Sequence, residues 1–491
     1  MLGPGGHSVL IRGNAGTGKT TMALQMIEEM QEIENSFYFS TRVSDAIMLN
    51  QFPWLARRLY GEDEGEVIHQ EVDEAHREMD GVPLEPPRPI PGEQDQARYW
   101  LNKLKLRGAF GFEVRPGQAF PQNRIDLSEL EKVYSTVERG GKGKALVVID
   151  SIDALAEACG VNQATVITSI QKDLVEGKRA NAIFVAESND RYLDYLGDGV
   201  VELVISDLDR RRLREMNILK LRGCAIHQPK YLYTLRGARM RTFPDRSSDA
   251  GLALKAWSSL PDREGKISLG LVDLDRLTKG GVAPGSIVLI ELGHGVPLPI
   301  TSLLEQVMVA NFVSHGHGVL WVPLKKETAE AARARMAQMV PRESFDRQVR
   351  IAEVTGESPD PNLPCLMPVE GSNARQDLSW KNVAFALKET SPPSLSIMGF
   401  DTLESIYGGK TMDQLTEHFA AVKRHRHLFV GFTSPSTQST RRLTDLASCH
   451  LKVERIGGTV IVYGVEPFTE CNVLSISDGQ EGPRLELVPI I

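Results

Sequence analysis

The chain has few of the features that mark secreted, membrane-spanning or zinc-binding proteins. Its five cysteines are odd in number and scattered, and no two of them form a CxxC pair. This spacing argues against a disulfide framework and a zinc site, and it favours a reducing compartment. No apolar run reaches the length of a transmembrane helix. Because Met1 leads directly into Gly3-Pro4-Gly5-Gly6, with no room for a signal peptide, we expect a cytoplasmic protein without a membrane partner.

The composition also lacks an excess of positive charge. The net charge is −8 over 491 residues, so the whole molecule is not drawn to nucleic acid, and any such binding would need a local basic patch. Hydrophobic residues make up 41% and charged residues 24%, which is ordinary for a soluble globular protein. The length predicts two or three domains.

One stretch near the N-terminus carries a recognisable chemistry. It fits the phosphate-binding pattern G-x-x-x-x-G-K-[ST] and reads Gly13-Asn14-Ala15-Gly16-Thr17-Gly18-Lys19-Thr20-Thr21. A short apolar strand is predicted just before it and an amphipathic helix just after it, and this context disfavours an ordinary glycine-rich turn. Glycines let successive backbone N–H groups surround phosphate oxygens, and the helix N-terminus adds partial positive charge. Lys19 would reach the β- and γ-phosphates, and the Thr20 hydroxyl would bind Mg2+.

A second half of this site is predicted further along the chain. Residues 145–149 form a continuous apolar run that ends in Asp150, as in a central parallel strand. At the carboxyl end of that strand Asp150 could hold the water shell of the Mg2+ bound by Thr20. A helix over 163–176 and a strand over 182–186 follow, so strands and helices alternate. The pattern predicts an α/β fold, a mainly parallel sheet with helices on both faces and nucleotide at the carboxyl ends of its strands.

The composition changes twice within the first half. Residues 62–80 are strongly acidic and 83–91 are proline-rich, so an insertion is expected over about 61–125. A solvated surface loop is favoured over a binding role for it. Residues 210–246 contain eleven Lys or Arg against two acids, and strands over 215–221 and 230–235 would form a β-hairpin. Such an antiparallel extension would close a nucleotide domain over 1–245, followed by a linker over 246–265.

The second half then repeats the landmarks of the first. Residues 280–290 echo residues 3–11, and Gly293 corresponds to Gly13. In that alignment Leu298 and Pro299 stand where Gly18 and Lys19 stood, and the prolines of this loop stiffen the chain and remove N–H donors. We therefore expect a degenerate copy of the domain over 266–491, with little or no nucleotide binding and a structural or partner-binding role.

Tandem RecA-like halves with these landmarks resemble the KaiC family of ATPases, and more particularly its GvpD-like members, the gas-vesicle regulators. The segment Phe39-Ser40-Thr41-Arg42-Val43-Ser44 stands where KaiC proteins carry a pair of glutamates. Lys220-Leu221-Arg222-Gly223 resembles the segment that reaches the neighbouring subunit's nucleotide site. The resemblance implies ATP as the nucleotide, a homo-oligomeric ring or filament with a hexamer favoured, and γ-phosphate contacts from Lys220 and Arg222 in trans.

The chain departs from that family at the catalytic pair. One of the two glutamates activates the attacking water, but Ser40 and Thr41 occupy those positions and cannot act as a carboxylate base. Hydrolysis is therefore expected to be weak, with Glu187 and Asp153 as the acids that could replace the base.

Two functions follow from these observations. The first is an ATP-dependent regulatory or scaffold protein whose nucleotide state controls oligomer assembly and the binding of a protein partner. The second is a DNA-acting recombinase paralogue that uses the basic segment 210–246, with Tyr231, Tyr233 and Phe243 as platforms for bases. A kinase is disfavoured because the second loop lacks its lysine. A metal enzyme is disfavoured because the two H-x-H pairs, 315/317 and 425/427, have no further ligand nearby.

Overall fold

The computed structural model describes residues 6–30, 35–40, 48, 51–52, 54, 106–108, 145–187, 190–245, 257–324, 327–355, 361–479 and 482–491. The chain divides into two compact units, the first formed by Met1–Leu208, Leu213–Thr242 and Ile491, the second by Asp209–Arg212 and Phe243–Ile490. The insertion expected over about 61–125 lies outside the described residues apart from 106–108. Most of the predicted linker, 246–256, lies outside them as well.

The first unit is built on a sheet with the strand order β3-β2-β4-β5-β1-β6-β7-β8-β9. Neighbouring strands from β3 to β6 run parallel, whereas β7 and β8 pair antiparallel. The strands are β1 (Ser8–Gly13), β2 (Asn35–Ser40), β3 (Leu106–Gly108), β4 (Ala145–Asp150), β5 (Asn181–Ala186), β6 (Gly199–Leu208), β7 (Arg211–Leu221), β8 (Lys230–Thr234) and β9 (Arg241–Phe243).

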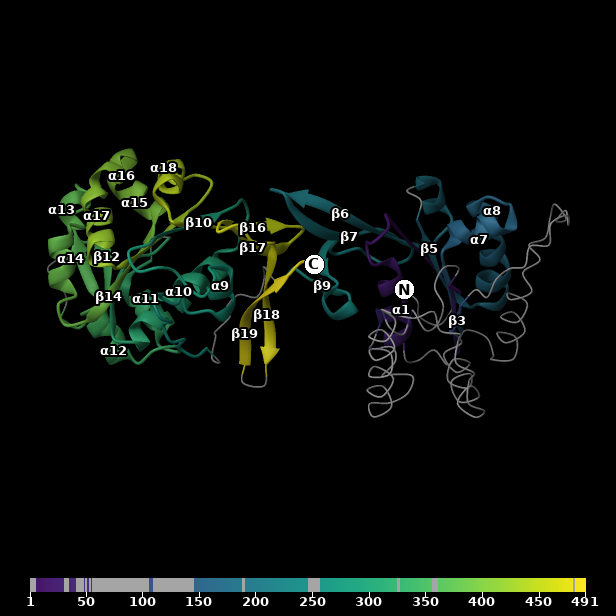
Figure 1. Ribbon diagram of the computed structural model, residues 1–491, viewed down its shortest axis with the longest axis horizontal. Coiled ribbons are helices and arrows are strands. Elements are labelled where there is room, and N and C mark those ends of the chain that lie inside the picture. Colours follow the sequence, from purple (N-terminus) through teal and green to yellow (C-terminus); the bar gives the residue numbers. More distant parts are fainter. Residues whose placement is uncertain are drawn as a thin grey trace, which may run out of the picture. The chain divides into compact units, whose positions relative to one another are not determined.

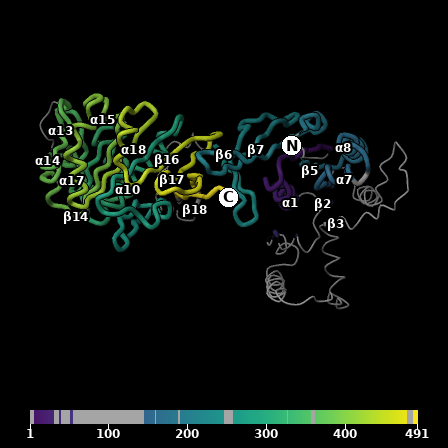
Figure 2. Tube along the Cα trace, turned by 45° about the horizontal axis from the view of Figure 1, so that its top comes forward, coloured from purple at the N-terminus to yellow at the C-terminus, as the bar shows by residue number. Residues whose placement is uncertain are grey.

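Helices cover both faces of this sheet because its central strands are apolar on both sides. Leu24 and Ile27 of α1 (Lys19–Glu29) pack on the face that carries Val9 and Ile11. The opposite face is covered by α7 (Ile152–Cys159), α8 (Gln163–Ile170) and the π-helix η1 (Gln171–Gly177). Figures 1 and 2 both show α7 and α8 side by side next to β5. The helix predicted over 163–176 is thus present, with its second half in the wider π form. Two short 3-10 turns complete the unit, η2 (Arg191–Tyr195) and η3 (Arg236–Ala238).

The sequence pattern does not predict the long strand β6, which follows β5 in the sheet-forming part of the chain. The burial of β6 alternates irregularly, so its sequence lacks the continuous apolar run that identified its neighbours. Asp209 and Arg210 join β6 to β7 with φ values of 46° and 64°. Two consecutive residues of positive φ are typical of a type I′ turn, which joins antiparallel strands. The hairpin predicted from strands over 215–221 and 230–235 is the antiparallel pair of β7 and β8, and β7 begins earlier than expected, at Arg211.

The second unit has a sheet with the order β13-β12-β11-β14-β15-β10-β16-β17-β18-β19. Its pairs from β13 to β16 are parallel and the last three pairs are antiparallel. The strands are β10 (Ile287–Leu292), β11 (His317–Val322), β12 (Val349–Val354), β13 (Leu366–Val369), β14 (Ser391–Gly399), β15 (Leu428–Thr433), β16 (Cys449–Ile456), β17 (Thr459–Glu466), β18 (Asn472–Gly479) and β19 (Gly482–Pro489).

Two layers of helices enclose this second sheet (Figure 1). One layer packs against Val288, Ile290 and Trp321 and consists of α9 (Val272–Leu277), α10 (Leu298–Ser314), α11 (Ala329–Met336) and α12 (Arg342–Gln348). The other packs against Leu289 and Phe429 and consists of α13 (Ala374–Asp377), α14 (Trp380–Ala386), α15 (Phe400–Tyr407), η4 (Gly408–Lys410), α16 (Thr411–Gln414), α17 (Thr416–His425) and α18 (Thr440–Leu446).

The two sheets share one topology. The order β12-β11-β14-β15-β10-β16-β17 in the second unit matches β3-β2-β4-β5-β1-β6-β7 in the first. The predicted fold class is therefore confirmed: an α/β protein with two mainly parallel sheets flanked by helices, as in tandem RecA-like domains. Within the ranges that the structure describes, none of the helices is both long and apolar enough to cross a bilayer.

Candidate functional site

The glycine-rich loop joins the carboxyl end of β1 to the start of α1. Gly13 has a φ of 150°, and a Cβ there would lie 2.2 Å from the carbonyl oxygen of Leu203. Gly18 has a φ of 90°, and a Cβ there would lie 2.8 Å from a methyl carbon of Leu235. Both positions therefore require glycine, for their backbone conformation and for the close approach of β6 and of the chain after β8.

Lys19 is buried at the base of this loop. Its Nζ donates to the carbonyl oxygens of Gly13, at 2.7 Å, and Asn14, at 2.9 Å. The ammonium group is thus held against the loop where phosphate oxygens would be received, the place expected for the lysine of this motif.

Asp150 and Thr20 are brought together although they are 130 residues apart in sequence. The Thr20 hydroxyl donates to Oδ2 of Asp150 at 2.6 Å. The hydroxyl of Tyr38, on β2, donates to the same oxygen at 2.7 Å. Hydroxyl and carboxylate oxygens are hard ligands that suit Mg2+ in phosphate sites, where the ion keeps several waters. The residues present therefore fit the predicted ion.

The candidate bases lie at the same edge of the sheet. Glu187 directly follows β5, between the strands that lead to the loop and to Asp150. The Glu187 N–H donates to Oδ2 of Asp153 at 2.6 Å, and Oδ1 of Asp153 accepts from Gln163 at 2.7 Å. Asp153 thus has a structural role that joins α7, α8 and β5. The backbone of Ser40 ends β2, beside Asp150 in the register; its side chain and all of Thr41 lie outside the described residues.

Two residues that the sequence did not single out contact the loop directly. The hydroxyl of Tyr233, on β8, donates to the carbonyl oxygen of Thr17 at 2.5 Å. Nη1 of Arg214, on β7, donates to the carbonyl oxygen of Gly16 at 2.9 Å. In the sequence Tyr233 appeared only as a possible base-stacking residue and Arg214 only as one cation of a basic run. Their partners lie about two hundred residues away, and no local pattern signals such a pairing.

Lys220 and Arg222 lie at the other edge of the sheet. The Arg222 N–H bonds the carbonyl of Asp198, just before the start of β6, and its guanidinium forms an ion pair with the Asp198 carboxylate at 2.8 Å. Lys220 Nζ donates to the carbonyl oxygen of Gly197 at 2.6 Å. Because β6 starts beside Val9 and the loop follows the opposite end of β1, neither cation can reach phosphate in its own loop. Contacts in trans remain a prediction.

Several cations of the basic segment are occupied within the chain. Arg211 is buried and donates to the carbonyls of Gly464 and Thr469, and Lys230 forms an ion pair with Glu215 at 2.6 Å. Among the proposed platforms for bases, Tyr233 and Phe243 are buried in the core. Stacking on nucleic acid requires exposed rings, so the geometry does not favour the DNA-binding alternative.

The corresponding loop of the second unit has a different chemistry. It opens onto a cavity of about 450 Å³ lined by residues that include Gly293, His294, Leu298 and Asp401. Asp401 lies in the first turn of α15 instead of ending a strand, and its Oδ1 accepts hydrogen bonds from Ser434, at 2.9 Å, and from Thr437. The lining that the structure describes for this cavity contains neither lysine nor arginine. Its residues could not neutralise a triphosphate.

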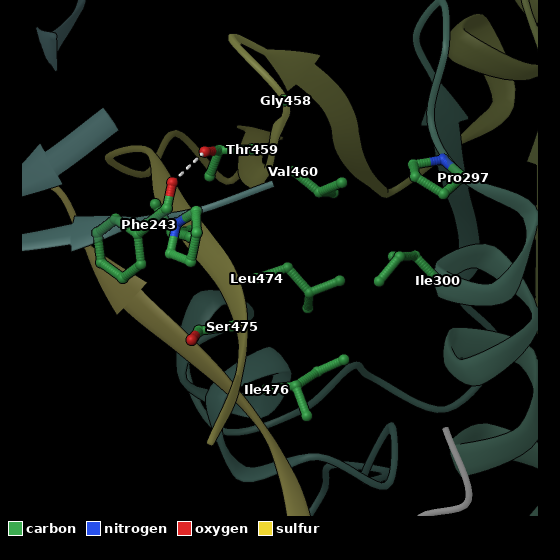
Figure 3. Close-up of a pocket in the computed structure, with 11 residues that line it drawn as sticks. Phe243, Pro297, Ile300, Gly458, Thr459, Val460, Leu474, Ser475 and Ile476 are labelled. Atoms are coloured by element: carbon green, nitrogen blue, oxygen red, sulfur yellow. Dashed lines mark hydrogen bonds between the residues drawn. The ribbon is translucent and has the colours of Figure 1, made fainter. Parts of the chain in front are cut away.

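A second cavity in this unit is small and apolar (Figure 3). It has a volume of about 50 Å³, and the side chains of Ile300, Val460, Leu474 and Ile476 point into it. The Thr459 hydroxyl, at its rim, donates to the carbonyl oxygen of Phe243 at 3.0 Å. Pockets for small molecules usually measure at least about 300 Å³, so this cavity is a packing defect and not a nucleotide site.

The first unit is also similar to a known family. Residues 1–220 match the GvpD gas vesicle protein, P-loop domain. Over its whole length the chain is 21% identical to Protein GvpD1 and 22% identical to Protein GvpD2 of Halobacterium salinarum, and each alignment covers 95% of the relative. The matched range contains the loop, Asp150, Tyr38 and Arg214. These similarities support a GvpD-like P-loop protein.

Proposed function

We propose that this chain is a GvpD-like regulatory protein that binds ATP and Mg2+ in its first unit. The observation that supports this most strongly is the Thr20–Asp150 hydrogen bond of 2.6 Å beside a phosphate-binding loop of the required glycine geometry. The loop N–H groups and the N-terminus of α1 would bind phosphate oxygens, and Lys19 would neutralise the β- and γ-phosphates. When bound, Mg2+ would neutralise phosphate charge, held by Thr20 and, through water, by Asp150.

Slow turnover suits the residues around this site. A GvpD-like chain with Ser40 and Thr41 in place of glutamates has no carboxylate at the usual position to take a proton from water. Asp153 accepts hydrogen bonds on both oxygens, and Glu187 directly follows β5 at the carboxyl end of the sheet, so we assign the role of the base to Glu187. Slow hydrolysis would make bound ATP a long-lived signal, which suits a regulator.

The nucleotide state would then control assembly. We place Lys220 and Arg222 on the γ-phosphate of a neighbouring subunit, so that ATP would bridge two copies in a ring or filament, with a hexamer favoured by resemblance. Their position at the sheet edge opposite their own loop is compatible with this role. A cation donated by a neighbour links phosphate charge to subunit contact. The assembled form would present or hide a surface for a protein partner in gas-vesicle regulation.

The test compares four samples by size-exclusion chromatography with light scattering: wild type and Lys19→Ala, each with and without ATP and Mg2+. We expect a larger species only in wild type with nucleotide. An identical mass in all four samples would exclude nucleotide-controlled assembly. A direct titration of wild type with ATP then distinguishes two explanations of such a result. If wild type binds ATP, only the proposed control of assembly is wrong; if it does not, the proposed nucleotide binding is wrong as well.

A further inference from the structure

The hairpin formed by β7 and β8 holds two consecutive carbonyl groups of the phosphate loop. The Tyr233 hydroxyl donates to the carbonyl of Thr17 at 2.5 Å, and Arg214 donates to the carbonyl of Gly16 at 2.9 Å. A third contact is apolar, because Leu235 packs against the backbone of Gly18. Three side chains from one hairpin therefore support three successive loop residues.

These bonds determine where the loop N–H groups point. In a planar trans peptide the C=O and the following N–H point in opposite directions. A Thr17 carbonyl turned toward Tyr233 sends the N–H of Gly18 away from the hairpin. A Gly16 carbonyl turned toward Arg214 sends the N–H of Thr17 back into the loop, where it donates to the carbonyl of Asn14 at 3.4 Å and closes the turn. Positive φ values of 76° at Gly16 and 90° at Gly18 give the loop the alternation that forms an anion-binding nest.

Tyr233 is well suited to a fixed supporting role. Its side chain is completely buried. Burial raises the pKa of Tyr233 to about 12, although the charge of the neighbouring Arg214 acts in the opposite direction. The hydroxyl therefore remains protonated, and able to donate, at neutral pH. A buried aromatic ring also has few alternative conformations, so the bond to the loop costs little entropy.

We propose that Tyr233 and Arg214 are positioning residues that preorganise the loop for the polyphosphate part of its ligand and couple the loop to the β7–β8 hairpin. This inference rests on the proposed nucleotide binding and deepens it. Since coupling between two parts of a protein is reciprocal, polyphosphate bound to the loop should in turn stabilise the hairpin. The strand that carries Arg214 ends at Lys220 and Leu221. Binding of phosphate to the loop would therefore also stabilise the position of Lys220 at the other edge of the sheet.

The test uses Tyr233→Phe with Tyr231→Phe, on the same strand, as matched control. Each is titrated with ATP–Mg2+ and with inorganic tripolyphosphate, which lacks the base and ribose. Loss of one hydrogen bond that orients the loop should weaken both ligands about tenfold in Tyr233→Phe, and neither in the control. Equal weakening of the two ligands is the signature of a phosphate effect, whereas a general loss of structure would lower the melting temperature of the free protein.

A second pair of variants keeps the test independent of the folding of Tyr233→Phe. Arg214→Lys replaces a guanidinium that donates to the carbonyls of Gly16 and Ile491 with an ammonium that lacks its planar fork, and Arg212→Lys on the exposed side of β7 is its control. We expect weaker tripolyphosphate binding in Arg214→Lys only. In hydrogen exchange, the loop amides of the free variants should exchange faster than in wild type while those of β4 should not.

The outcomes distinguish two failures. If wild type binds neither ATP nor tripolyphosphate, the proposed function is wrong. If wild type binds both, and Tyr233→Phe and Arg214→Lys bind them with unchanged affinity, nucleotide binding stands and the positioning role is overturned.

Discussion

Asp150 receives two hydroxyl hydrogen bonds on one carboxylate oxygen, from Thr20 and from Tyr38. The bond from Thr20 is expected for a phosphate loop, whereas the bond from Tyr38 depends on the side chain that β2 places beside β4. Tyr38 is buried, and burial, reinforced by the charge of Asp150, raises its pKa well above the usual value, so its hydroxyl stays protonated. A fixed donor of this kind orients a carboxylate for the water shell of a metal ion.

Tyr38→Phe should therefore weaken Mg2+ binding. We expect the Mg2+ concentration that half-saturates the stimulation of ATP binding to rise about tenfold, because loss of an outer-shell partner commonly costs ten- to a hundredfold in metal affinity. Affinity for ATP in excess EDTA should be unchanged. Tyr407→Phe is the matched control, since Tyr407 also donates to a carboxylate, Asp377, but lies in the second unit. An unaltered Mg2+ dependence in Tyr38→Phe would show that Thr20 orients Asp150 without help.

Gly13→Ala should abolish phosphate binding by distorting the loop. The added Cβ would lie 2.2 Å from a backbone oxygen of β6, which cannot move without breaking the sheet. Gly16→Ala is the control, because it also has a positive φ but nothing lies within 4 Å of its Cβ. In a thermal melt and an ATP titration, Gly13→Ala should lose stability and binding, and Gly16→Ala should show only the smaller effect of backbone strain. Equal losses in both would mean that φ alone dictates glycine at Gly13.

At the scale of elements, α10 differs from its counterpart α1. Most positions of α10 are buried, and they include the carboxylate of Glu305. Glu305 accepts hydrogen bonds from Trp321 at 3.4 Å and from the N–H of Leu324 at 3.1 Å. Burial raises its pKa from 4.5 to about 7, the largest cause being loss of solvent around the charged form. The side chain of Glu305 is therefore protonated and uncharged over most of the acidic pH range.

This acid gives the second unit a pH-dependent stability. Between the unfolded pKa of 4.5 and the folded pKa of about 7 the folded state holds a proton that the unfolded chain releases, so stability falls as pH rises through that window. Above this pH window, the free energy of unfolding is lower by about 3 kcal/mol than it is below the window. Glu305→Gln should raise the melting temperature at about pH 8 and change it little at about pH 5. Exposed Glu330→Gln is the control. A Glu305→Gln curve parallel to wild type would contradict this assignment.

The strands of both sheets were predictable to different degrees. β1, β4, β5, β10 and β15 are centred on apolar runs, because parallel strands covered on both faces bury most of their side chains; polar residues such as Arg12 and Glu291 lie near strand ends. β6 was missed because half of its length is solvated on one side and its pattern is irregular. Residues 396–401 resemble the run that ends in Asp150 and would place Asp401 at the end of a strand. In the structure β14 ends at Gly399, so Asp401 lies in the first turn of α15. Element ends depend on neighbours that a sequence does not display.

At the scale of the whole molecule, one topology is present twice and one phosphate loop is intact. The second loop has Pro299 where the first has Lys19, and its cavity is lined by Asp401 and His294. We therefore expect one ATP per chain in a calorimetric titration of wild type and none for Lys19→Ala. Pro299→Lys should not restore a second site, because Leu298 still occupies the position of a loop glycine. Residual binding of one ATP by Lys19→Ala would place a functional site in the second unit.

The sequence by itself determined the loop, Asp150 and the duplication, because each is carried by consecutive residues or by a repeated order of landmarks. Tertiary structure alone decided that Tyr38 meets Asp150, that Arg214 and Tyr233 hold the loop carbonyls, and that Lys220 and Arg222 face away from their own loop. The contacts of Tyr38, Arg214 and Tyr233 depend on strand order and register, which bring together residues more than a hundred positions apart. Long-range pairing of that kind leaves no periodic trace in the chain.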